Sequence, residues 1–137
     1  MADFDLTPAL VKPSAKGLSK RLIGISGAAI TPGMPVYRDS ASKLIKISDA
    51  NGSPDEARVD GIAVTGSSEG QPVIYIPEDD DFDLGVAIGS GQIVVLSASS
   101  GKLAPDEDAE TGWVKTFVGI GIGGTKIALR PLKGGSV

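Results

Sequence analysis

The sequence contains neither cysteine nor histidine among its 137 residues. The absence of cysteine excludes disulfides and fits a protein made in a reducing cytosol. The absence of both residues removes the commonest general base and the strongest nucleophile of enzyme active sites. The neighbouring carboxylates lie in polar runs, where no apolar surroundings would raise a pKa. We therefore predict no enzymatic activity, no catalytic residue and no cofactor, and a hydrolase that uses carboxylates ranks last among the alternatives.

Aromatic residues and long apolar runs are also scarce. The chain has one Trp, two Tyr and three Phe. It has no apolar run of about 18 residues, so no transmembrane helix is expected. Its first residues lack the basic and apolar regions of a secretory signal, which is not expected either. A formal net charge of -4 argues against general nucleic-acid binding. Neither a membrane nor a nucleic acid is thus a predicted partner.

Glycine, proline and β-branched residues are abundant instead. The chain has 19 Gly and 9 Pro, and its 13 Ile and 11 Val outnumber its 10 Leu. β-Branched side chains suit a pleated sheet, and Gly with Pro suits tight turns. No segment has a convincing helical pattern. The sequence predicts an all-β fold, a small β-barrel or sandwich.

Two pairs of glycines indicate an internal duplication. Gly33 and Gly91 each precede an apolar strand and lie 58 residues apart, and the same spacing separates Gly61 from Gly119. Gly33 follows Pro32 and supplies the positive φ of a turn. We predict a single β domain over residues 21–137, built from two similar strand–turn–strand units at approximately 22–77 and 84–132.

Residues 1–20 are predicted to form an extended N-terminal arm. Pro8 and Pro13 disfavour a helix in the residues before them. The arm carries apolar side chains that a polar linker would not have. We interpret it as an interface with a neighbouring subunit or another protein, and a frayed terminus is the alternative. The candidate interface residues of the arm are Phe4, Leu6, Leu10 and Val11.

A glycine-rich run at residues 119–124 matches the G-x-G-x-x-G pattern of dinucleotide-binding sites. That site needs a helix after the glycines, whereas residues 125–130 alternate as a strand does. The run is better interpreted as part of a hairpin, in which Ile120 and Ile122 face one side and the glycines allow a close backbone approach.

An acidic run at residues 78–83 separates the two units. Its carboxylates suit a hard cation such as Ca²⁺, but the run lacks the spacing of an EF-hand loop. We interpret it as a solvated loop that joins the units, and we predict no metal site.

Trp113 follows a second acidic loop and Gly112. Tryptophan with a polar handle often anchors interfaces, although a place in the core is the alternative. We add Trp113 to the candidate interface residues. It is also the one plausible aromatic platform for a glycan.

Four segments together resemble a known family. The segments are Gly33-Met34-Pro35-Val36-Tyr37, the strand that begins at Lys43-Leu44, Val59-Asp60-Gly61-Ile62-Ala63, and Gly91-Gln92-Ile93-Val94-Val95 with Gly119-Ile120-Gly121. The chain resembles the small capsid decoration (cement) proteins of tailed bacteriophages over roughly residues 22–130.

The resemblance implies an all-β structural protein of the virion, synthesised in the host cytoplasm and placed on the outer capsid surface. It implies a homo-oligomer, a trimer before a dimer, which binds the major capsid protein and stabilises the head shell. It transfers no individual site residue. The alternative function is a β-barrel ligand- or glycan-binding module of a fibre or adhesin.

Overall fold

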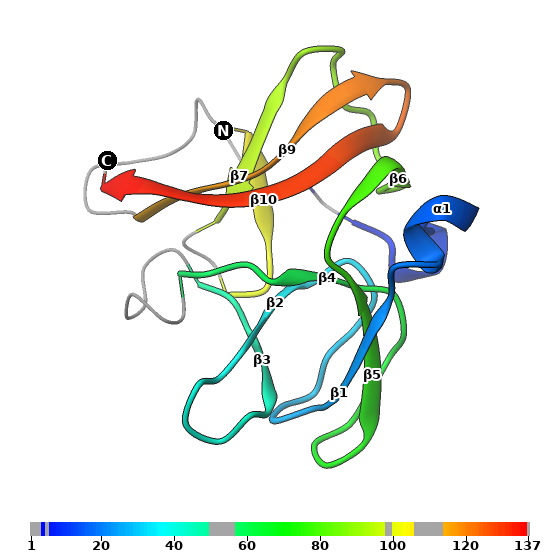
Figure 1. The fold of residues 1–137 in the computed structure, drawn as a ribbon. Coiled ribbons are helices and arrows are strands. Elements are labelled where there is room, and N and C mark those ends of the chain that lie inside the picture. The colour runs from blue at the N-terminus through cyan, green and yellow to red at the C-terminus, as the bar shows by residue number, and fades with distance from the viewer. Residues whose placement is uncertain (1–3, 5, 50–56, 98–99, 106–113, 137) are drawn as a thin grey trace.

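The computed structural model describes residues 4, 6–49, 57–97, 100–105 and 114–136, the side chains of 114–115 and 132–136 excepted. It confirms the all-β prediction, with two five-stranded antiparallel sheets and no closed barrel, an arrangement consistent with a sandwich (Figure 1). The first sheet has the order β1-β5-β4-β2-β3 and the second the order β6-β10-β9-β7-β8. The first sheet contains β1 (Leu22–Ile25), β2 (Pro35–Arg38), β3 (Ile45–Ile47), β4 (Gly61–Ala63) and β5 (Pro72–Ile76). The second contains β6 (Asp79–Asp83), β7 (Ile93–Leu96), β8 (Leu103–Pro105), β9 (Val114–Gly123) and β10 (Lys126–Ser136).

The strand order of the first sheet is repeated in the second. Each strand from β1 to β5 has its counterpart five strands later in the chain. The pairing of β2 with β3 and β4 recurs in β7 with β8 and β9, at an offset of 58 residues. The repeated pairs are Val36–Gly61 and Val94–Gly119, and Arg38–Ile45 and Leu96–Leu103.

The turns before β2 and β7 repeat as well. Gly33 and Gly91 have φ angles of 97° and 84°, as a turn glycine requires. The N–H of Gly33 donates to the Ala63 carbonyl at 2.8 Å, and the N–H of Gly91 donates to the Gly121 carbonyl at 2.7 Å. The same 58-residue offset therefore relates hydrogen bonds as well as glycines.

Gly61 and Gly119 occupy the same crowded place in the two sheets. A Cβ on Gly61 would lie 2.6 Å from the Ile76 carbonyl oxygen, and one on Gly119 would lie 2.5 Å from the Ala128 carbonyl oxygen. The neighbouring strand thus approaches so closely that only glycine fits. The 119–124 run lies in the β9–β10 hairpin, as the sequence predicts.

The core consists of two clusters. The smaller one, which includes Ile30, Val36 and Ile45, lies against the first sheet. The larger one takes most of its side chains from the second sheet and its loops, but it also contains Ile62 and Ile76 of the first sheet. The first repeat unit therefore buries part of its own sheet against the second unit.

Residues 79–83 of the acidic run form a strand and not the solvated loop that the sequence predicts. This strand is β6, and it pairs with β10. Phe82 is fully buried opposite Ile127, which anchors the strand to the core. Asp79 is also buried because the N-terminal arm supplies donors to its carboxylate.

The arm contains two short helices that the sequence did not predict. They are the 3-10 helix η1 (Pro8–Leu10) and the α-helix α1 (Ala15–Leu18). Ser14 caps α1 by accepting a hydrogen bond from the Gly17 N–H at 3.0 Å. Helix α1 lies beside β6 (Figure 1).

Candidate functional site

The N-terminal arm lies between the two edge strands of the second sheet. The N–H of Phe4 donates to the Leu103 carbonyl of β8 at 2.9 Å. Lys12 and Asp83 of β6 exchange two backbone hydrogen bonds, each of 2.9 Å. Edge strands have unpaired backbone groups that invite association. The arm covers part of both edges within the chain itself.

A buried carboxylate holds the far end of the arm. The backbone N–H of Ser14 donates to Asp79 Oδ2 at 2.7 Å, and the Ser14 hydroxyl donates to Asp79 Oδ1. The N–H of Asp81 donates to the same carboxylate at 3.1 Å. Gly17 packs so closely that a Cβ there would lie 2.3 Å from the Asp79 carboxyl group. This clip fixes α1 against β6.

The predicted arm residues fall into three environments. Val11 is 6% exposed and belongs to the larger core cluster. Phe4 and Leu6 are partly buried against the same cluster. Leu10 is 51% exposed. Of these four residues, Leu10 presents the most surface to a partner, and Trp113 lies outside the described residues.

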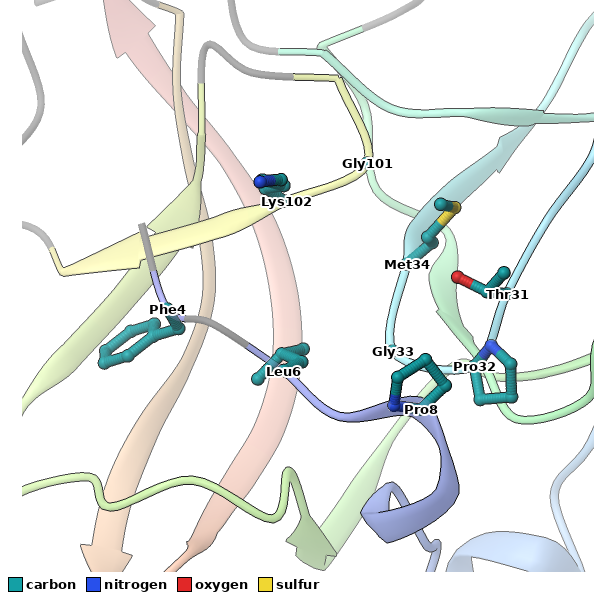
Figure 2. A pocket seen from close by; sticks show the side chains of 9 residues that line it. All are labelled: Phe4, Leu6, Pro8, Thr31, Pro32, Gly33, Met34, Gly101 and Lys102. Atoms are coloured by element: carbon teal, nitrogen blue, oxygen red, sulfur yellow. The ribbon is translucent and has the colours of Figure 1, made fainter. Parts of the chain in front are cut away.

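A cavity of about 230 Å³ lies between the arm and two turns of the β domain. Figure 2 shows Phe4, Leu6 and Pro8 along one side, with Met34 and Pro32 across from them. Its lining is mostly apolar. The complete lining is Phe4, Leu6, Pro8, Thr31, Pro32, Gly33, Met34, Gly101 and Lys102. Such a cavity can accept an apolar side chain, but its lining offers no acid–base pair.

Ion pairs surround the clip on the surface of β6. Lys20 Nζ lies 2.7 Å from Glu78, and the Lys20 contact lowers the pKa of Glu78. Arg130 contacts Asp80 and lowers its pKa, with a smaller contribution from Lys16. Glu78, just before β6, and Asp80, within it, are thus held ionised by basic residues in or just after α1 and in β10. Among the described residues, no three acidic side chains gather as a metal site would require.

A second hollow, of about 460 Å³, lies over β2 and is lined by Arg38, Asp39, Ser40, Lys43, Arg58 and Asp60. Arg58 stacks over the Tyr37 ring at 5.6 Å and lies 3.2 Å from Asp60. A hydrogen bond from Lys46 lowers the pKa of Asp39 to about 2, helped by Ser42 and the Ala41 N–H. Three of its lining side chains are cationic and two are anionic, and both acids have a basic partner within the chain.

Two strips of exposed or half-buried aliphatic residues lie on the sheets, one on each sheet. The β7–β9 strip consists of Ile93, Ile120 and Ile122. The β1–β5 strip consists of Ile23, Ile25, Pro72 and Ile74, which are cross-strand neighbours. The sequence predicts that Ile120 and Ile122 share one face, but it indicates no function for either strip. Alternating aliphatic residues indicate a strand face, and only the packing shows whether that face is covered.

Comparison of the chain with protein-family models found no match, and comparison with curated proteins found no significant similarity. In the described part of the chain, no helix is long and apolar enough to cross a membrane.

Proposed function

We propose that this chain is a structural protein of a tailed-bacteriophage virion. It binds the outer surface of the capsid as a homo-oligomer, a trimer before a dimer, and stabilises the head shell. The major capsid protein is its partner. The proposal begins from the resemblance of residues 22–130 to capsid decoration proteins.

The observation that carries the proposal is the exposure of large aliphatic side chains on an otherwise well-packed β domain and its N-terminal arm. Eight such residues among the described ones are at least 38% exposed. Scattered exposed aliphatic residues are ordinary, but strips of them on sheet faces mark surfaces for other proteins. The exposed residues are Leu10, Leu18, Leu22, Ile23, Ile25, Ile93, Ile120 and Ile122.

A lattice of identical sites turns modest contacts into stable decoration. Each copy of the chain needs to contribute only a small apolar contact, because neighbouring copies that are joined to it raise the effective concentration at the shell. Leu10 suits such a contact, since its side chain is half exposed while the surrounding arm is fixed by Lys12 and Ser14. We therefore assign Leu10 to the capsid contact.

The test is binding to undecorated heads assembled from the major capsid protein encoded in the same genome. We expect saturable co-sedimentation and heads that resist higher temperature once they are decorated. Leu10→Asp should lower occupancy, whereas Ala41→Asp, in an exposed turn on the first sheet, should not. Absence of binding by the unaltered chain at saturating concentration would reject the function.

A further inference from the structure

The β7–β9 strip has an equivalent position in the first sheet, and that position shows how such a sheet face is covered. Ile93 and Ile120 are directly opposed in the β7–β9 pair, and Ile122 follows on the same face of β9. Ile93 and Ile120 are each 38% exposed, and Ile122 is 45% exposed. The described residues leave this face open.

The equivalent place in the first sheet is covered. Pro35 and Ile62 precede Ile93 and Ile120 by 58 residues and are opposed in the same way. Ile62 is fully buried and belongs to the larger core cluster, which the second sheet dominates. In the first sheet, this face is therefore packed against the second unit, which has the same fold.

The first sheet also shows where that contact continues. Ile62 is opposed to Ile76, and Ile74 lies two residues further along the same face of β5. Ile74 is opposed to Ile23, which is 64% exposed. One aliphatic face thus runs from the buried contact between the two units into the β1–β5 strip, where its cover ends.

We propose that a second copy of the chain covers these strips, with the β7–β9 strip of one copy packed on the β1–β5 strip of the next. We assign a second copy to this role because, within one chain, the equivalent face of the first sheet is covered by the second unit, which has the same fold. The two strips belong to different sheets and differ in sequence. The contact is therefore head to tail, and each copy offers one strip of each kind.

This inference rests on the homo-oligomer in the proposed function and names the surfaces that form it. Head-to-tail contacts either close into a ring or continue as a filament. Because each copy uses both strips, blocking one strip leaves a copy that can still join one neighbour through the other.

The test uses Ile23→Glu and Ile120→Glu in the full chain, with mass measured by light scattering and sedimentation. We expect the unaltered chain to be an oligomer and each variant alone to be weakened by about a hundredfold or more in self-association. An equimolar mixture should form a heterodimer, because Ile23→Glu keeps the β7–β9 strip and Ile120→Glu keeps the β1–β5 strip. If each strip instead bound the same strip of another copy, mixing the two variants would restore no association.

Two further sets of variants guard against misfolding and against general loss of apolar surface. Ile23→Thr and Ile120→Thr keep a β-branched residue and should weaken association by about tenfold with an unchanged circular dichroism spectrum. Leu10→Glu removes an exposed aliphatic side chain outside both strips and should leave the mass unchanged. Equal dissociation by Leu10→Glu would overturn the assignment of the strips.

The two proposals fail in different ways. An unaltered chain that stays monomeric at about 100 µM overturns the head-to-tail contact, because a dissociation constant above that concentration is too weak to hold a defined oligomer in solution. If that monomer still decorates heads, the proposed function survives. An oligomer that dissociates as described but binds no heads retains the contact and rejects the function.

Discussion

Ser14 and Asp79 form a clip between the N-terminal arm and β6. Ser14 gives both its backbone N–H and its hydroxyl to one carboxylate that is only 2% exposed. A buried carboxylate is costly unless such donors satisfy it. The arm and the acidic strand therefore depend on each other.

Removal of the carboxylate should be the more damaging change at this clip. Asp79→Ala leaves three donors without their acceptor, two from Ser14 and one from Asp81, and we expect a loss of about 3 kcal/mol. Ser14→Ala keeps the backbone contact and should cost about 1–2 kcal/mol through the hydroxyl and the helix cap. Urea unfolding measures both. The exposed Ser19→Ala is the matched control, and equal losses at Asp79 and Ser19 would contradict the clip.

The two crowded glycines should respond alike. Gly61→Ala and Gly119→Ala each place a methyl group within 2.6 Å of a carbonyl oxygen on the next strand. We expect each to destabilise the chain by about 2–3 kcal/mol. Gly66→Ala is the control, since its nearest heavy atom is 4.0 Å from the added Cβ. Thermal unfolding measures the effect, and equal melting temperatures for all three variants would argue against the close approach.

Replacement of Lys43 by glycine should stabilise the folded chain. It has a φ of 64°, whereas the residue 58 positions later, Gly101, has a φ of 76°. A side chain in this left-handed region costs about 1–2 kcal/mol. Lys43→Gly should raise the free energy of unfolding by about 0.5–1 kcal/mol, after the added chain entropy of glycine is counted. Ser40→Gly, in the same turn, should not stabilise the chain, and a gain there equal to that of Lys43→Gly would refute the explanation.

The carboxyl of Asp39 should titrate near pH 2 in the folded chain. Lys46 is the main cause of its low pKa, and Ser42 comes next. Because folding lowers this pKa from 3.8, the stability it contributes is complete above that value and is lost as the pH falls toward 2. Carboxyl NMR titration checks this directly. Lys46→Met should move the midpoint up more than Ser42→Ala does, and an unchanged midpoint in Lys46→Met would be evidence against the ion pair.

The parts of the fold that the sequence predicted depend on local chemistry. The turn at Gly33 and the hairpin after Gly119 follow from which residues tolerate a positive φ or a close backbone approach. The strand at residues 79–83 could not be predicted in this way. Its buried Asp79 is stabilised by Ser14, 65 residues earlier in the chain, and no local pattern shows that pairing.

The candidate interface residues show the same limit. The sequence of the arm is apolar, but apolar character alone does not separate Val11, which enters the chain's own core, from Leu10, which does not. The isoleucines of the two strips have the same alternation as covered strand residues. Their exposure depends on where the other sheet packs, which is a property of the tertiary structure.

The path of the arm also has a kinetic consequence. Phe4 pairs with β8 and Lys12 pairs with β6, so the arm makes its contacts with strands that follow it much later in the chain. Contacts between residues so distant in sequence slow folding, because the loop must close before the contact is gained. The second sheet should consequently mature last, with arm docking as the step that completes it.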